Sequence, residues 1–502
     1  MPSELKQKAV KGLGWLGVGQ VVDQVLSLCI TGILARLLLP RAFGLVGMVV
    51  VFTAFLERFK GLGLGLALIQ RRDVTEEQLT TVFTIHVAVG LILAGLTAAA
   101  GPLIAEFYDE PILATVAIFI GMRFFVTSFQ GVFASLLRKR LHFRRLVVTR
   151  IVSKVVGGAV GITMALLDFG VYALVAEGLT YEIVFGASLW LLGDWRPRAR
   201  PRPGSIRGMF RFGANVTGAS LLHYFSRYAD YLLIGRFLGP GPLGVYTIAY
   251  RIMLLPLRRV SRQISQVVFP AFSAVQNDLP RVRRGFLEMS QMVAAITFPA
   301  MAGLVIVAPD AVPLILGEKW LRAVFLIQVL ALTGALQSIT GPVTHILRAQ
   351  GRAGLHFGYK LCETPLTVLA FVIGLRWSVE GVAVAYTGLQ MLVNPVLLFL
   401  LARVIGLRFG RLYRALRGPV GATIAMAAAV FLYRYGAVRV GLGATWLLCS
   451  EIGVGVVVYA AAIRFGSPGL YRLGSETAKI LLTPLVPSLE ASRETAEVGA
   501  SE

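Results

Sequence analysis

Several charged residues lie inside long apolar stretches of this 502-residue chain, where a charge is costly unless it meets a partner or a polar cavity. Most of them are basic. Arginine binds phosphate groups well, because its planar guanidinium donates two parallel hydrogen bonds. The basic residues within the apolar stretches therefore predict a site for an anion. The candidates are Arg58, Arg123, Lys154, His223, Arg227, Arg251, Arg258 and Arg259.

Acidic residues within the same stretches are candidates for binding a coupling ion. Asp230 shares one helix face with His223 and Arg227, at positions i+7, i and i+4. Asp23 lies on a similar polar stripe of the first apolar stretch, and Glu363 lies in a later one. The alternative is that such charges pair internally and only hold helices together, and for any single residue it stays open. Basic residues outnumber acidic ones in the predicted cleft, which favours an anion.

The elements that must position these residues are membrane-spanning helices. Hydrophobic residues make up 56% of the chain and charged residues 15%, whereas soluble proteins carry about 25% charged residues. The apolar blocks are about 20 residues long or longer, enough to cross a bilayer as helices. The sequence predicts an all-α polytopic membrane protein with 14 transmembrane helices. They are expected near 12–38, 42–68, 79–104, 111–137, 144–167, 171–193, 207–238, 243–270, 285–309, 322–347, 353–376, 379–402, 413–436 and 442–464.

The loops between these spans alternate between basic and uncharged or acidic. "RKRLHFRR" (138–145) and "RPRARPR" (196–202) are strongly basic, whereas "EFYDEP" (106–111) has neither Lys nor Arg. The positive-inside rule places both termini in the cytoplasm. This bias accounts for most of the net charge of +23, and no extramembrane domain offers a basic face, so no nucleic-acid partner is expected. Trp195, Trp320 and Trp377 lie near span ends and are expected to anchor the membrane interface.

A charged, proline-containing segment occurs twice. "ILARLLLPRAFG" (33–44) and "LIGRFLGPGPLG" (233–244) share Arg, Leu, Pro and Gly at an offset of 200, and "LHF" (141–143) recurs at 355–357. Six helices matched by six helices of the same orientation predict two pseudo-symmetric lobes with a site between them. The expected organisation is an N-terminal lobe (1–193), a basic cytoplasmic linker (194–206), a C-terminal lobe (207–402), two further helices (403–465) and a cytoplasmic tail (466–502).

This layout of six, six and two helices resembles the multidrug/oligosaccharidyl-lipid/polysaccharide exporter superfamily. Stretches throughout the chain resemble its bacterial polysaccharide-exporter branch, which includes the O-antigen flippases for lipid-linked oligosaccharides. They are "GLGLGLALIQRRDVTEEQLTTVF" (61–83), "LLRKRLHFRRL" (136–146), "YFSRYADYLLIGRFLGPGPLGVYTIAYRIMLLP" (224–256), "VFPAFS" (268–273) and "LILGEKW" (314–320).

The resemblance implies a flippase of the bacterial cytoplasmic membrane that moves undecaprenyl-diphosphate-linked oligosaccharide by alternating access. Its partners would be that lipid, the bilayer, and the polymerase and glycosyltransferase machinery of surface polysaccharide. An ion-coupled multidrug exporter of the same fold and a peptidoglycan-precursor flippase are the alternatives, and the excess of arginine disfavours the first. No enzyme is expected, because the outer loops are too short to carry a catalytic site. Neither a phosphate-binding loop nor a set of metal ligands is present in the sequence, so no cofactor is expected.

Overall fold

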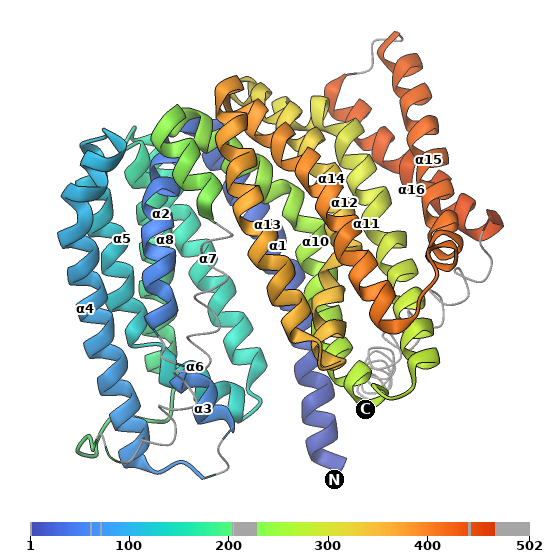
Figure 1. Ribbon diagram of the computed structural model, residues 1–502. Coiled ribbons are helices and arrows are strands. Elements are labelled where there is room, and N and C mark those ends of the chain that lie inside the picture. The colour runs from blue at the N-terminus through green and yellow to red at the C-terminus, as the bar shows by residue number, and fades with distance from the viewer. Residues whose placement is uncertain are drawn as a thin grey trace, which may run out of the picture. The chain divides into compact units, whose positions relative to one another are not determined.

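The computed structural model describes residues 3–60, 63–70, 73–202, 204, 228–439 and 443–466 (Figure 1). These residues are almost entirely helical and include no strand, which confirms the all-α class. The chain folds into two compact units, Met1–Gly244 and Val245–Glu502.

In the N-terminal unit, long helices alternate with tight turns. α4 packs along α5, α7 packs along both α8 and α1, and α5 also contacts α8 and α2. Residues 228–238 are helical and precede α10. The helices are α1 (Ser3–Leu37), α2 (Pro40–Lys60), α3 (Leu64–Gln70), α4 (Glu76–Tyr108), α5 (Ile112–Ser128), α6 (Gly131–Lys139), α7 (Phe143–Leu166) and α8 (Val171–Leu192). α10 (Pro240–Ala274) begins in this unit and continues into the C-terminal unit.

The C-terminal unit repeats part of this pairing. α11 packs along α12, as α4 packs along α5. α13 packs along α14, as α7 packs along α8, and α12 contacts α14, as α5 contacts α8. α15 and α16 pack on each other and on α11. The elements are α11 (Leu279–Ile315), α12 (Leu321–Ala349), α13 (Ala353–Gly374), α14 (Ser378–Ile405), α15 (Phe409–Arg439), α16 (Ala444–Gly466) and the short helices η2 (Glu318–Trp320) and η3 (Leu375–Trp377).

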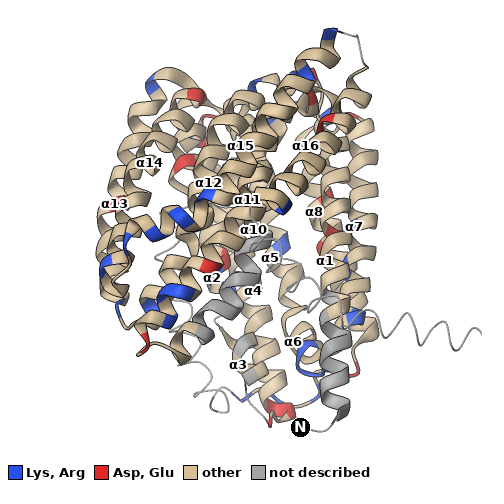
Figure 2. Cartoon of the chain, turned by 90° about the vertical axis from the view of Figure 1, so that its right-hand side faces the viewer, with Lys and Arg blue, Asp and Glu red and all other residues tan. Residues whose placement is uncertain are grey.

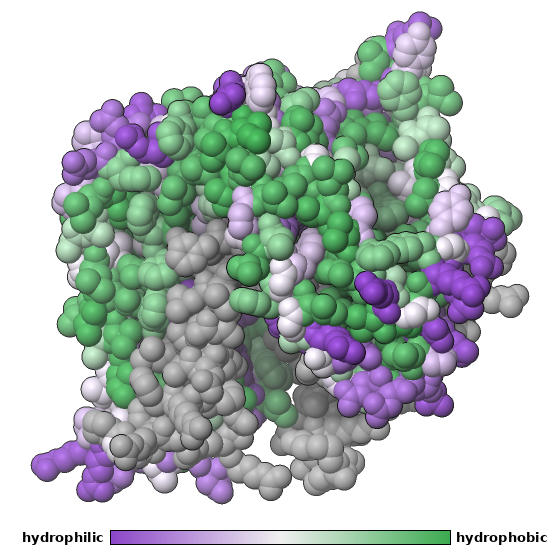
Figure 3. Space-filling model, viewed as in Figure 1, coloured by the Kyte–Doolittle hydropathy of each residue, from purple (hydrophilic) through white to green (hydrophobic). Residues whose placement is uncertain are grey.

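The surface of the helices suits a lipid environment. Among the described residues, ten helical segments are long and apolar enough to cross a membrane, or eleven if α5 and α6 form one bent span. Most of each helix carries no charged residue (Figure 2). Figure 3 shows mainly hydrophobic side chains over α4 and over α13 and α14. These helices carry exposed leucines, among them Leu103, Leu361 and Leu392. The chain is therefore a multi-pass membrane protein, while the count of fourteen spans stays a prediction.

The two copies of the repeated segment touch each other within the N-terminal unit. α2 begins at Pro40 and α10 begins at Pro240. A Cβ atom added to Gly44 would lie 1.7 Å from the carbonyl oxygen of Pro240, and one added to Gly244 would lie 1.8 Å from that of Pro40. The contact is reciprocal, as it must be when a twofold axis relates two equivalent segments. Only glycine permits this approach of the two backbones.

A second pair of equivalent turns fixes the offset of the repeat more closely. After α6, the amide nitrogens of Arg140, Leu141 and His142 donate to the carbonyls of residues 136, 138 and 137. After α12, Gln350, Gly351 and Arg352 make the same three bonds to residues 346, 348 and 347. Leu141 and Gly351 both have positive φ, 59° and 69°. The structural offset here is 210, so the "LHF" match at 214 is out of register by about one helical turn.

Two predicted spans are broken in the structure. The span expected at 111–137 consists of α5 and α6, which meet at an angle of 43°. The span expected at 42–68 consists of α2 and the short α3. Hydropathy reports how apolar a segment is and not its direction, so neither break is visible in the sequence.

The predicted roles of two tryptophans are wrong. Trp195 is buried in a cluster with Phe133 and donates its indole N–H to Glu76 Oε2 at 2.9 Å. Trp320 is fully buried, and only Trp377 is exposed. Two hydrogen bonds hold the basic linker against α4. One is the bond of Trp195 to Glu76, and the other is donated by the Arg202 amide to Thr81 Oγ1 at 2.9 Å.

Candidate substrate site

Two of the predicted basic residues lie on different helices, and each contacts a residue of α8. Arg123, on α5, places Nη2 3.3 Å from Glu182 Oε1. Lys154, on α7, places Nζ 5.6 Å from the ring centre of Tyr181, a cation–π distance. Because Tyr181 and Glu182 are consecutive residues of α8, the two cations converge on one level of the N-terminal unit.

Gln130 holds the acidic partner in place. Its Nε2 donates to the Glu182 carbonyl at 2.8 Å and to Glu182 Oε2 at 3.1 Å. Gln130 is buried and lies in the break between α5 and α6. The interruption of the span therefore places the amide side chain of Gln130 beside Glu182.

Further charges surround this pair. Lys60, at the end of α2, interacts electrostatically with both Glu182 and Arg123. We call Lys60, Arg123, Gln130, Lys154, Tyr181 and Glu182 the α8 polar cluster. Around it lie further charged residues that act electrostatically on its members. They are Asp23, Glu57, Arg150 and Glu177.

The exposure of the α8 polar cluster suits a site that a ligand can reach. The Arg123 side chain is 42% exposed, while that of Glu182 is 14% exposed. The acid is thus shielded by its partners, and the guanidinium keeps free surface. Arg150 lies 6.0 Å from the ring centre of Phe185, which stacks on Tyr181 with 6.0 Å between ring centres. Cationic side chains held beside aromatic faces are suited to contact the phosphate part of a glycolipid.

The predicted excess of basic residues is not seen among these side chains. The cluster and its charged neighbours hold four basic residues (Lys60, Arg123, Arg150, Lys154) and four acidic ones (Asp23, Glu57, Glu177, Glu182). The side chains of Arg227, Arg258 and Arg259 lie outside the described residues, as does His223, and they are not part of this count.

The other described candidates are not members of the α8 polar cluster as defined above. Arg58 is half-buried near the end of α2, and Arg251 is exposed on α10 in the C-terminal unit. Asp230 is buried, and its Oδ1 accepts from the Tyr231 amide at 2.8 Å. Asp23, the other acid of that prediction, acts on Tyr181 as described above.

Glu363 anchors a separate polar network in the C-terminal unit. Its Oε2 lies 2.8 Å from Lys360 Nζ, and its Oε1 accepts from Gln390 at 3.3 Å. Asn394 donates to Gln390 Oε1 at 2.8 Å and accepts from Thr340 Oγ1 at 2.9 Å. The network joins α12, α13 and α14. Among the described residues, no group of acidic, His or Cys side chains is arranged to hold a metal ion.

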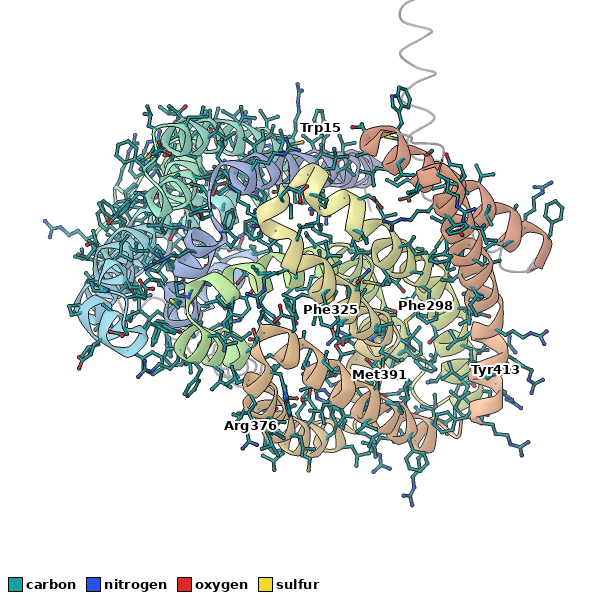
Figure 4. The ribbon with its side chains drawn as sticks, turned by 90° about the horizontal axis from the view of Figure 1, so that it is seen from above. Trp15, Phe298, Phe325, Arg376, Met391 and Tyr413 are labelled. Atoms are coloured by element: carbon teal, nitrogen blue, oxygen red, sulfur yellow. The ribbon has the colours of Figure 1, made fainter. Side chains whose placement is uncertain are left out.

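The view along the helices separates interior from peripheral residues of this unit. Phe298 lies on α11 toward the middle of the unit, whereas Tyr413 lies at the edge of α15 (Figure 4) and is 74% exposed. Within the Glu363 network, Glu363, Gln390 and Asn394 are buried, whereas the Lys360 side chain is 38% exposed.

Sequence reasoning missed the acidic half of the α8 polar cluster. Glu177, Tyr181 and Glu182 lie within "GVYALVAEGLTYEIVFG", in the middle of a predicted span. Two glutamates at that depth are a signal for a polar interior. The predicted anion site contains only basic residues, so it includes no acidic partner for the arginines on this helix.

Comparisons with known proteins agree with this architecture. Residues 33–325 match the family described as "Polysaccharide biosynthesis protein". The chain is 28% identical over 400 residues to the lipopolysaccharide biosynthesis protein WzxC of Escherichia coli K12, covering 78% of this chain and 80% of WzxC. It is 29% identical over 463 residues to the teichuronic acid biosynthesis protein TuaB of Bacillus subtilis 168, covering 91% of this chain and 95% of TuaB.

A solved structure shares the fold. The inward closed conformation of the lipid II flippase MurJ superposes with a TM-score of 0.68 at 15% sequence identity. The match covers 94% of this chain and 99% of that protein. At this identity the likeness concerns the arrangement of the helices alone.

Proposed function

Since the chain belongs to the polysaccharide biosynthesis protein family, we propose that it is a flippase for lipid-diphosphate-linked oligosaccharide. It moves undecaprenyl-diphosphate-linked repeat units from the inner to the outer leaflet of the bacterial cytoplasmic membrane. The relatives in lipopolysaccharide and teichuronic acid biosynthesis support a polysaccharide substrate, and the shared fold with a lipid II flippase supports transport of a lipid. No bond of the substrate is made or broken.

One observation carries the proposal beyond the family. Arg123 and Lys154 leave two different helices and contact consecutive residues of α8 within the apolar spans of one unit. Cations at this depth are costly unless they face polar ligands. A diphosphate is such a ligand, because it accepts the paired N–H donors of an arginine. The glycan then occupies the polar surroundings, and the polyprenyl tail stays in lipid.

The proposed architecture has two lobes of six helices, 1–193 and 207–402, followed by two helices within 403–465. The reciprocal contact of Gly44 and Gly244 supports it. So do the equivalent turns at an offset of 210 and the shared pairing of α4, α5, α7 and α8 with α11 to α14. Parallel repeats of this kind are typical of transporters that alternate access to a central site.

Both termini are proposed to lie in the cytoplasm. Reporter fusions at Asp109 and Lys319 are expected to read extracytoplasmic, and fusions at Pro201 and Arg411 cytoplasmic, because the basic loops stay inside. Alkaline phosphatase and green fluorescent protein fusions at each site measure this. An extracytoplasmic reading at Pro201 would overturn the topology.

The function itself is tested by depleting the protein in its own bacterium. Lipid-linked oligosaccharide should accumulate in the inner leaflet, with its repeat unit complete and its diphosphate intact, because synthesis continues while export stops. The measurement is mass spectrometry of the lipid fraction together with protection of the glycan from an added periplasmic glycosidase. If the lipid-linked unit instead reaches the outer leaflet at normal levels and only polymer length changes, the protein acts in polymerisation and the proposal fails.

A further inference from the structure

Three charged residues meet in the C-terminal unit, outside the α8 polar cluster and the Glu363 network. Asp310 is on α11, Arg434 on α15 and Glu451 on α16. Arg434 Nη2 lies 2.8 Å from Asp310 Oδ2, and Arg434 Nε lies 3.8 Å from Glu451 Oε1. The three helices pack on one another, so this triad sits at their common interface.

Arg434 already contacts two partners other than Glu451. Its Nη1 donates to the carbonyl of Ile306 at 2.9 Å, and its Nη2 faces Asp310. Only Nε is directed to Glu451, at a distance too long for a hydrogen bond. The guanidinium therefore neutralises Asp310 first.

Glu451 is left without hydrogen-bond donors. Its side chain is 0% exposed, and neither carboxylate oxygen has a hydrogen-bond partner among the residues that the structure describes. On α16 itself, the Ser450 hydroxyl is directed to backbone carbonyls of its own helix, and Tyr459 donates to Ala295 O at 2.6 Å. The charged groups that act on Glu451 from the packed helices are Asp310 of α11 and Arg434 of α15.

With both carboxyl groups ionised, the three side chains would carry a net charge of −1. Two carboxylates share one guanidinium inside membrane-spanning helices, and an ionised carboxylate that lacks donors costs several kcal/mol when buried. One proton on Glu451 removes this charge. It also supplies an O–H donor beside Asp310, the carboxylate that acts electrostatically on Glu451.

We propose that the triad of Asp310, Arg434 and Glu451 is a proton-binding site, with the proton carried by the Glu451 carboxyl. Binding converts a carboxylate and a proton from water into a neutral carboxylic acid, and release reverses this. Asp310 and Arg434 each lie five residues before the end of their helices, and Glu451 lies seven residues after the start of its own. The site is thus about 8–10 Å from one end of all three helices, which is the end proposed to be extracytoplasmic.

The use of this proton rests on the proposed function. An ion can drive a transporter only if it binds the two conformations with different affinity. The triad joins the last two helices to α11, so gain and loss of the proton change how α15 and α16 are held. We assign it the role of coupling export to the proton gradient.

Infrared difference spectroscopy of the purified full-length protein in lipid nanodiscs tests the proton site directly. The wild-type protein should show the carbonyl stretch of a protonated carboxylic acid at neutral pH, and Glu451→Gln should lose this band. Glu363→Gln is the matched control, since Glu363 is also buried but is paired with Lys360 at 2.8 Å, and this substitution should leave the band unchanged. A band that survives Glu451→Gln, or that Glu363→Gln removes equally, overturns the proposal.

Transport in proteoliposomes tests the coupling separately. With lipid-linked oligosaccharide as substrate, an imposed pH gradient should stimulate wild-type transport, and Glu451→Gln should lose the stimulation while retaining transport without a gradient. Equal stimulation of both proteins rules out the coupling role. If the wild-type protein moves no lipid-linked oligosaccharide, the proposed function fails, whereas the infrared result still decides the proton site.

Discussion

Replacing Gly44 or Gly244 by alanine is expected to lower export at least about tenfold while the protein still reaches the membrane. The added methyl group would lie 1.7–1.8 Å from a backbone carbonyl oxygen of the facing segment, which cannot move aside as a side chain would. Overpacking of this kind costs about 3 kcal/mol at the upper end of its usual range. That cost lowers the population of this conformer roughly a hundredfold, and alternating access must pass through each conformer.

The neighbouring Gly241 provides the matched control. It lies in the same first turn of α10, but a Cβ atom added to it would have nothing within 4 Å. Gly241→Ala should therefore export at the wild-type rate. Export is measured as the fraction of lipid-linked oligosaccharide in the outer leaflet, with the amount of membrane protein determined alongside. Equal activity of Gly44→Ala and Gly241→Ala would show that the close approach is not needed.

Arg123→Gln should reduce transport roughly ten- to a hundredfold, because it removes a charge-assisted hydrogen bond worth about 1.5–3 kcal/mol to the diphosphate. Arg123→Lys should restore only part of the activity, since an ammonium cannot reproduce the two parallel bonds of the guanidinium. The measurement is the initial rate of lipid-linked oligosaccharide transport in proteoliposomes, at saturating and at limiting substrate. The loss should be larger at limiting substrate.

Glu182→Gln distinguishes substrate binding from a structural ion pair. If Arg123 serves mainly to neutralise Glu182, the two substitutions should impair folding and transport to the same extent. If Arg123 binds the diphosphate, Glu182→Gln should keep transport near the wild-type rate, because it frees the guanidinium. Arg322→Gln, which breaks the exposed pair with Glu380 at 2.9 Å, is the control for loss of an arginine as such. Parallel losses in Arg123→Gln and Glu182→Gln would remove Arg123 from the site.

Much of the fold could be predicted because a membrane imposes a simple rule on the sequence. Apolar stretches long enough to cross the bilayer must be helical, since their backbone groups find no water. The beginnings of α2 at Pro40 and α10 at Pro240 follow from the same logic, because proline fits the first turn of a helix. The breaks at Gln130 and after Lys60 could not be predicted, because they depend on contacts with other helices.

The sequence offers cations for the proposed site and not their geometry. The cost of a buried charge makes Arg123 and Lys154 candidates, and their role in binding stays a prediction. It could not show that both point to α8, because the rotation of each helix about its axis is set by packing. Nor could it show that Glu363 pairs with Lys360, or that Glu182 contacts Arg123 and Gln130. The positions of His223 and Arg227, and the side chains of Arg258 and Arg259, lie outside the described residues, so their roles stay predictions.

The reciprocal glycine contact also bears on how such a chain can evolve. If the two halves were separate, identical polypeptides, Gly44 would face its own copy across the axis, and any mutation would act twice at the same place. In a duplicated and fused gene the two sides mutate independently, so one can be kept while the other changes. The two segments differ at a neighbouring position. Arg41 pairs with Glu110 at 2.7 Å, whereas the position 200 residues later is Gly241. A fused chain can thus carry on one side an ion pair that a symmetric dimer would have to carry on both.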